Sequence, residues 1–445
     1  MWKPFPGIVF SVLAFMVLGS SYAQDTTKTG LKWDLPTCLS YAEKNNLQLK
    51  SLEQTKLSNE QNVLLAKAAK TPNVSGAMSQ SFVHSKNADP VVGGFQTQAS
   101  FSSNYSLNGS FVLYNGGYLN NSVKQKEYTL QASDLEVQAA FNNITIQITQ
   151  AYLNILLVRE NIVYLEDLLN TSKAQLEQGK KQYDAGSIAL KDYTQLEGTV
   201  ATDDYNLVTA RNAYRQNLIT LKQLLQLSSA VSFDVVVPDT LYLSPVILPL
   251  PDAEEKAAAT RPEIRSGELT VQAAEMGLKM SKAGKLPTVT LNGALSTGYS
   301  NNQTVAYLQQ LNNNFYQRAG LSMAIPIFNN RIARTNIEQS KIQIEQAKIT
   351  LQGTKTTVDQ AVEQSYIALL NARNQFNAAS VQLRVNKQTY DITNAQLKLG
   401  AITMVDLLVQ KSLYVQAVQN YLQAKYSAIL NHKVYDFYTG IPVTL

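Results

Sequence analysis

The sequence predicts a mainly α-helical chain with a small β part, arranged as two tandem structural repeats. The first observation is a motif in which an alternating apolar run ends in an aromatic residue and Asn, before a very long polar helix pattern. It occurs at residues 108–121 (NGSFVLYNGGYLNN) and at residues 324–335 (AIPIFNNRIART). The copies lie about 214 residues apart, and self-similarity at a fixed period indicates an internal repeat. The second observation is that a Pro-free helix pattern of about 65 residues, or about 100 Å, follows each copy.

The N-terminal residues 1–23 predict a secretory signal peptide. A short positively charged start and an apolar run at residues 8–18 precede a small-x-small cleavage site at residues 21–23. The apolar run is too short for a membrane-spanning helix, which needs about 20 residues. We therefore expect an exported protein that begins near Gln24.

Composition excludes several classes of function. Cys38 is the only cysteine and the two histidines, His84 and His432, are isolated, so neither a disulfide framework nor a Cys/His metal site is expected. Charged residues make up 16% of the chain with a net charge of +5 and no basic block, which argues against a nucleic-acid partner. The sequence also lacks a Gly-rich phosphate loop and clustered catalytic residues, so we expect no enzyme activity and no cofactor.

The first repeat, residues 24–227, is expected to contain a helix, two strands and a long helical hairpin. Pro72 ends the first helix, and Gly186 lies in the break between the two helices of the hairpin. In chain order the segments are a helix at 36–70, strands at 74–82 and 99–114 around a loop at 85–98, and helices at 117–183 and 188–227.

The second repeat, residues 252–438, follows a Pro-rich connector at 228–251 that is expected to hold one short strand. Pro287 corresponds to Pro72, and Gly400 lies in the second helix break. The segments are a helix at 252–285, strands at 289–299 and 315–328 around a loop at 300–314, and helices at 332–399 and 402–438. Residues 439–445 form a C-terminal tail.

The four strands alternate between apolar and polar residues, which gives each strand one apolar and one polar face. Four strands are too few to close a barrel, and an open sheet with an apolar outer face would pair with other copies. Because small transmembrane barrels have at least about 8 strands, either two or three chains would have to combine their strands. The alternative is a soluble β-sandwich, which does not explain why long helices follow the strands at one end only.

This arrangement resembles the TolC family of outer-membrane efflux proteins over essentially the whole chain after the signal peptide. The specific elements are LYNGG at residues 113–117, PIFNNR at 326–331, and the helix breaks QYDAGSIALKDY at 182–193 and QLKLGAITMVDLL at 396–408. One such motif is a weak signal, but the duplicated set in this order is a strong one.

The resemblance implies a homotrimer whose 12 strands form one β-barrel in the outer membrane and whose helices form an α-barrel through the periplasm. The connector and the C-terminus would form a belt around the helices. Such a protein would be the passive exit duct of a tripartite efflux or type I secretion system. Its implied partners are outer-membrane lipid, an inner-membrane transporter and a periplasmic adaptor that docks on the helix-break tips.

The resemblance also implies a gate at these tips, where Asp192 and Asp406 match acidic family positions. Three copies of Asp406 around an axis would form a negative ring, and such rings constrict a pore and favour cations. The alternative for both residues is an acid at the start of a helix, which complements the helix dipole. Gly186 and Gly400 suit the left-handed conformation that often ends a helix.

The chain departs from the family pattern at three tip positions. A second acidic position is Val409, and the Tyr and Arg that latch the aperture are replaced by Leu397 and Ile402. We therefore expect that closure, if these residues form the gate, is apolar, because apolar constrictions close a pore by excluding water.

Two other functions remain open from the sequence. A structural or adhesive cell-envelope protein could use the long helices as a coiled-coil spacer, although a spacer does not need two matched tips. A nutrient porin would need the barrel without the long helices. The cargo and the class of transporter leave no recognisable trace in the sequence.

Overall fold

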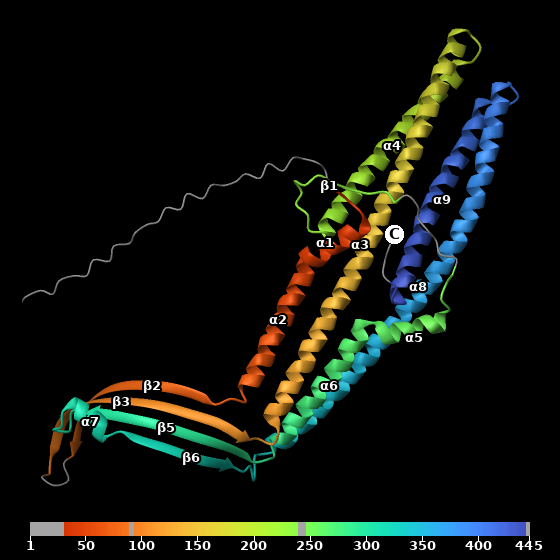
Figure 1. Cartoon of the computed structure of the whole chain (residues 1–445). Helices are drawn as coiled ribbons and strands as arrows, with labels where there is room; N and C mark the ends of the chain where they lie inside the picture. The colour runs from red at the N-terminus through yellow and green to blue at the C-terminus, as the bar shows by residue number, and fades with distance from the viewer. Residues whose placement is uncertain (1–30, 89–92, 239–245, 442–445) are drawn as a thin grey trace, which may run out of the picture.

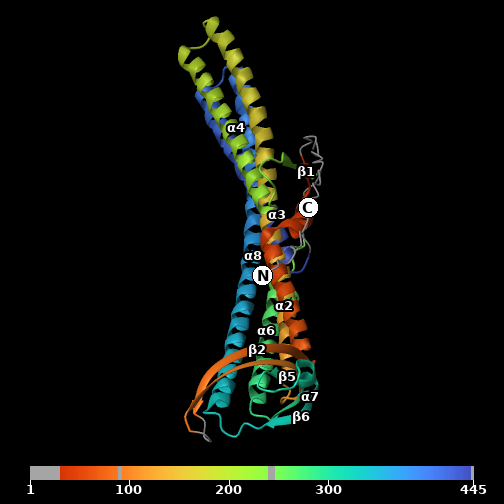
Figure 2. The same ribbon diagram turned by 90° about the vertical axis from the view of Figure 1, so that its left-hand side faces the viewer.

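The structure is a computed structural model that describes residues 31–88, 93–238 and 246–441. Two long helical hairpins lie side by side, and a sheet extends from their far end at an angle to them (Figure 1). The sheet is curved across its strands (Figure 2). The predicted signal peptide 1–23, the last four residues of the predicted tail and part of the predicted connector lie outside the described residues. The predicted domain boundaries stay predictions.

The helices occur in pairs of equal length, one from each half of the chain. α1 (Leu35–Asn45) and α5 (Leu250–Thr260) have 11 residues each, and α2 (Leu47–Ala68) and α6 (Pro262–Ala283) have 22 each. The long helices α3 (Tyr118–Asp184) and α8 (Ile332–Lys398) have 67 residues each, and α4 (Leu190–Leu224) and α9 (Met404–Tyr438) have 35 each.

The prediction of one continuous helix before each pair of strands was wrong. Asn46 separates α1 from α2 because its backbone is extended and its side-chain oxygen accepts hydrogen bonds from the N–H groups of Gln48 and Leu49. Arg261 separates α5 from α6 because it precedes Pro262, and a residue before proline is disfavoured in the α conformation. Each predicted helix is therefore two helices with a bend between them.

The four main strands form one antiparallel sheet in the order β2-β3-β5-β6. β2 (Asn73–Ala88) and β3 (Phe95–Tyr114) are longer than expected, because cross-strand pairing continues through most of the predicted loop at 85–98. β5 (Thr288–Ser300) agrees with its prediction, whereas β6 (Tyr316–Ala324) ends before Pro326, which has no N–H for the sheet. The predicted loop at 300–314 contains a short helix, α7 (Tyr307–Asn313).

The register of the sheet places most of the apolar side chains predicted for β3, β5 and β6 on one face, together with apolar residues of β2. Tyr105 pairs with Met78 and Thr297, and Leu291 pairs with Phe111 and Leu321. Ser, Asn and Gly residues such as Ser106, Ser296 and Asn108 occupy the other face. Many apolar side chains of the first face are exposed: Val74, Met78, Phe82, Leu107, Leu291, Leu295, Leu321 and Met323.

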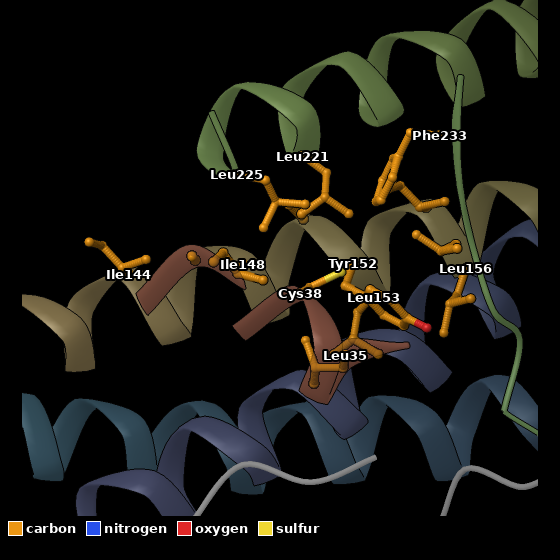
Figure 3. Packing of buried hydrophobic residues seen from close by; sticks show 14 of the residues in the cluster. Leu35, Cys38, Ile144, Ile148, Tyr152, Leu153, Leu156, Leu221, Leu225 and Phe233 are labelled. Atoms are coloured by element: carbon orange, nitrogen blue, oxygen red, sulfur yellow. The ribbon is translucent and has the colours of Figure 1, made fainter. Parts of the chain in front are cut away.

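The largest hydrophobic core lies where α1 and β1 (Leu31–Trp33) meet α3 and α4 (Figure 3). β1, which was not predicted, pairs in parallel with β4 (Phe233–Val235), the short strand expected in the connector. Cys38 lies beside Tyr152 in this core, and burial raises the pKa of its thiol to about 12. Cys38 is therefore a packing residue.

Among the described residues, no helix combines the length and the apolar character needed to cross a membrane.

Candidate functional site: the helical tips

Both hairpins end in the same backbone turn. Gly186, between α3 and α4, and Gly400, between α8 and α9, each have φ of +72°. The N–H of Gly186 donates to Tyr183 O at 2.8 Å, and the N–H of the next residue, Ser187, donates to Gln182 O at 2.7 Å. Two hydrogen bonds in this pattern are the Schellman motif, which satisfies the last carbonyls of a helix.

The second tip repeats these bonds residue for residue. The N–H of Gly400 donates to Leu397 O, and that of Ala401 donates to Gln396 O, both at 3.0 Å. No atom lies within 4 Å of where a Cβ would stand at either tip glycine. Glycine is therefore needed at both positions because it adopts the left-handed backbone conformation easily. An added Cβ would meet no neighbouring atom there.

The two tips differ where the returning helix begins. In the second tip Thr403 and Asp406 form a capping box: the Asp406 N–H donates to Thr403 Oγ1 at 3.3 Å, and the Thr403 N–H donates to Asp406 Oδ2 at 3.0 Å. The Thr403 hydroxyl also donates to Asp406 Oδ2 at 2.6 Å. These bonds from Thr403 hold the pKa of Asp406 below its usual value. In the first tip, Ala189 occupies the N-cap position, and α4 begins without a side-chain cap.

Aromatic residues distinguish the first tip. The rings of Tyr183 and Tyr193 stack across its break at 5.5 Å between centroids, with an interplanar angle of 16°. The corresponding residues of the second tip are Leu397, which is half-buried, and Leu407, which is buried.

The structure places the candidate gate residues on separate tips. Gly186 and Asp192 lie on the first, and Leu397, Gly400, Ile402, Asp406 and Val409 lie on the second, which ends closer to the sheet than the first (Figure 1). Ile402 is half-buried, whereas Val409 is 52% exposed. Leu399, which the sequence analysis did not select, is 84% exposed at the end of α8. Its position directly before the tip glycine was the available signal.

A buried polar cluster joins the two hairpins near the tips. Lys411 Nζ, from α9, donates to Asp203 Oδ2 on α4 at 2.6 Å and to Ser172 Oγ on α3 at 2.7 Å. The Ser172 hydroxyl donates to Asp203 Oδ2 at 2.5 Å, and the side chains of Lys411 and Asp203 are only 5% and 7% exposed. The sequence analysis missed this cluster. The sequence pattern that could have revealed the cluster is a lysine, Lys411, one helical turn after Leu407 on the buried face of α9.

Aromatic packing continues this contact between the hairpins. Tyr414, one turn beyond Lys411, meets Tyr164 of α3 edge to face at 5.9 Å and stacks on Tyr390 of α8 at 5.4 Å. Further along α9, Lys425 Nζ donates to both carboxylate oxygens of Glu160 on α3 at 2.8 Å, and the Tyr426 hydroxyl donates to the same carboxylate. α9 is thus tied to α3 by buried and half-buried polar groups.

Comparison with known proteins identifies this architecture. A sequence model of the family described as "Outer membrane efflux protein" matches residues 38–226 and 254–432, which together are most of the chain. The chain belongs to this outer membrane efflux protein family. It is accordingly an outer-membrane protein.

Several family members are similar in sequence over long stretches. The chain is 25% identical to "Outer membrane efflux protein BepC" of Brucella suis over 95% of its own length and 91% of that protein. It is 23% identical to "Outer membrane protein TolC" of Escherichia coli over 67% of this chain, a match that spans 61% of TolC. A match to "Toxin and drug export protein A" of Aggregatibacter actinomycetemcomitans also spans 61% of that protein, at 23% identity.

Solved structures of membrane channels share the fold. The outer membrane channel CmeC of Campylobacter jejuni has a TM-score of 0.78 at 17% identity and covers 98% of this chain and 94% of its own. CusC, whose crystal structures concern folding and transmembrane channel formation, has the same TM-score at 19% identity. The match covers 93% of this chain and 93% of CusC.

Among the residues that the structure describes in this chain, no group of three or more His, Cys, Asp or Glu residues is placed to hold a metal ion.

Proposed function

We propose that the chain is the passive exit duct of a tripartite efflux or type I secretion system, assembled as a homotrimer. The observation that carries this proposal is one chain that joins a sheet with an exposed apolar face to helical hairpins about 100 Å long. Such a chain has one end suited to a bilayer and another long enough to extend through the periplasm. Three copies would combine their strands into a 12-stranded β-barrel and their hairpins into an α-barrel.

Unpaired surfaces support assembly from several copies. β2 and β6 are the edge strands of the sheet, and edges of this kind pair with another chain or aggregate. Exposed isoleucines also recur along α8, where a neighbouring copy would cover them: Ile342, Ile349, Ile367 and Ile392.

The two halves of the chain are, on this proposal, tandem structural repeats. The equal helix lengths and the two identical tip turns support it, as do the two separate stretches that match the family. The connector, α5 and the C-terminal residues would form the belt around the α-barrel.

A periplasmic adaptor would dock on the tips and link the duct to an inner-membrane transporter that supplies the energy. The matched turns at Gly186 and Gly400 support this assignment, because each chain would present two similar helix ends to the adaptor. Relatives are named for the export of toxins, drugs and pyoverdine, so cargo export is the general activity that we propose for this chain.

We propose that the gate at the second tip closes by apolar contact. The carboxylate of Asp406 already accepts hydrogen bonds from its own helix cap, which favours the helix-start alternative over a gate ring for this residue. Leu397, Ile402 and Val409 are then the residues that would narrow the pore and exclude water.

Planar-bilayer conductance of the purified protein tests this function. We expect a small, stable conductance that rises in Ile402→Ala and changes little in Asp406→Ala. Ile188→Ala is the matched control, because Ile188 follows Gly186 at the same distance as Ile402 follows Gly400. A rise in Asp406→Ala alone would favour a polar gate, and an unchanged conductance in all variants would exclude these gate residues. No conductance from correctly assembled protein would favour the spacer function.

A further inference from the structure

The short helix α7 lies at the end of the sheet away from the hairpins (Figure 1). The hydroxyl groups of Tyr307, at the start of α7, and Tyr105 of β3 are 2.8 Å apart. Thr297 of β5 donates to the carbonyl of Leu311 at 2.5 Å. Because Tyr105 and Thr297 are register partners on the apolar face, these bonds fix α7 to that face.

Further contacts fasten α7 to the same region. The rings of Tyr307 and Tyr299 meet at 4.8 Å. Gln310 is buried in the centre of α7, accepts from the Ser300 N–H at 2.9 Å and donates to Val305 O at 2.7 Å. Ser103, the register partner of Tyr299, is buried although much of the sheet is exposed. α7 is therefore a docked element with its own polar anchors.

The exposed side of α7 is uncharged and combines one large apolar residue, Leu308, with the amide side chains of Gln309, Asn312 and Asn313. Leu308 is 78% exposed, and Phe315, just after the helix, is also exposed. No Asp, Glu, Lys or Arg occurs between Pro287 and Arg318, a stretch that includes β5, α7 and the start of β6. An exposed leucine beside tyrosine hydroxyls in an uncharged segment is the chemistry of the membrane–water interface, where aromatic rings collect.

The position of α7 along the strands agrees with this chemistry. Exposed Tyr114 and Phe328 mark the end of the apolar surface nearest the helices. From Tyr114 to Tyr105 β3 rises by about nine residues, or about 30 Å, which the usual strand tilt reduces to about 23 Å of height. The apolar band of an outer-membrane barrel is about 25 Å tall, so α7 lies at its outer edge.

We propose that α7 is an interfacial anchor whose Leu308 side chain enters the outer leaflet of the outer membrane, near the boundary between headgroups and acyl chains. Tyr105, Tyr299 and Tyr307 hold the helix at this depth, so the loop between β5 and β6 folds outward over the lipid-facing surface instead of into the pore. This inference rests on the proposed barrel and adds a lipid-contacting element to it.

Fluorescence quenching by brominated lipids tests the depth of α7. The full chain carrying Leu308→Trp is reconstituted in phosphatidylcholine vesicles with bromine either near the ester groups or near the middle of the acyl chains. The parent, in which Trp33 is the only tryptophan after the predicted cleavage site, supplies the background emission. The added emission should be quenched at least about twofold more by the shallow bromines than by the deep ones.

Two controls separate this inference from the proposed function. Leu321→Trp lies on the apolar face inside the band, about 8 Å in height from its inner edge, and should be quenched most by deep bromines. Asn108→Trp lies on the polar face and should not be quenched. If Leu321→Trp is quenched but Leu308→Trp is not, α7 contacts water or a neighbouring copy, and the anchor is excluded while the barrel remains. If Leu321→Trp also escapes quenching, the apolar face does not meet lipid, and the proposed barrel fails.

A second substitution tests the tyrosine contacts themselves. Tyr307→Ala in the Leu308→Trp background removes the hydroxyl contact with Tyr105 and the ring contact with Tyr299. The shallow quenching should fall towards the parent background, because α7 loses its attachment to the sheet. Unchanged quenching would show that these tyrosines do not set the position of α7.

Discussion

The two hairpins use one backbone plan with different side chains. Both tips turn through a glycine with φ of +72° and the same pair of hydrogen bonds. Eleven positions after the glycine, however, the first hairpin has the exposed Glu197 and the second has the buried Lys411. The backbone bonds thus need only glycine at one position, whereas the neighbouring positions are free to determine which hairpin supplies the buried cation that joins the two.

The largest expected difference between the hairpins is at this eleventh position. Lys411→Met should lower the free energy of unfolding by about 3–5 kcal/mol, because it leaves the Asp203 carboxylate buried without its cation. Denaturant unfolding followed by helical circular dichroism measures the effect. Glu197→Met, the matched variant in the first hairpin, should change stability by less than about 0.5 kcal/mol, since Glu197 is exposed.

A double variant distinguishes a lost ion pair from a lost side chain. Lys411→Met combined with Asp203→Leu removes both buried charges, and replacement of a buried pair by apolar residues is often neutral. We expect the double variant to recover most of the stability lost in Lys411→Met. If both variants are equally unstable, packing around the lysine stem, and not the uncompensated charge, explains the loss.

Substitution of either tip glycine should lower the free energy of unfolding by the same amount, since the two have the same backbone geometry. Gly186→Ala and Gly400→Ala should each cost about 1 kcal/mol, because a Cβ is unfavourable in the left-handed region. Thermal unfolding measured by circular dichroism gives both values. A difference of more than about 0.5 kcal/mol between the tips would show that their side chains constrain the turns unequally.

The elements that follow local rules were predictable from the sequence. The long helices and the helix breaks depend on the absence of proline and on the glycines, and α3 and α8 begin and end within two residues of their expected limits. The apolar face of the sheet followed from period-2 alternation, which the register confirms.

Features that depend on distant partners were not predictable. β1 exists only because β4, about 200 residues later, pairs with it, and no local pattern marks three residues as a strand. α7 looked like a polar loop, since its attachment depends on Tyr105 and Thr297 in other strands. The Lys411 cluster likewise combines residues from three helices. The break at Asn46, in contrast, had a local signal, because Asn is a favoured N-cap residue.

Exchange of the N-cap residues of the two tips, Ala189 and Thr403, should change stability by a smaller amount. Thr403→Ala should cost about 1 kcal/mol, because the N–H of Asp406 loses its side-chain acceptor. Ala189→Thr, at the same position of the first tip, should add up to about 1 kcal/mol if its hydroxyl accepts from the N–H of Asp192. Thermal unfolding of the two single variants shows whether each substitution lowers or raises stability. Destabilisation by Ala189→Thr would show that the first tip cannot adopt the capped geometry.

The smallest expected effect is the pH dependence of this cap. The pKa of Asp406 is lowered in the folded chain by the hydroxyl and N–H of Thr403, so the ionised carboxylate stabilises the fold. This contribution is complete above the ordinary value of 3.8 and is lost as the pH falls through the lowered pKa, because protonation then removes a charged acceptor from the Thr403 donors. Asp406→Asn should therefore be less stable than the parent at pH 7 and should approach it at pH 3, as measured by thermal unfolding at both values. A stability difference that stays constant with pH would mean that Asp406 acts through its shape and not its charge. At the start of the returning helix, the second tip would then differ from the first through the polar side chain of its N-cap residue, Thr403 in place of Ala189.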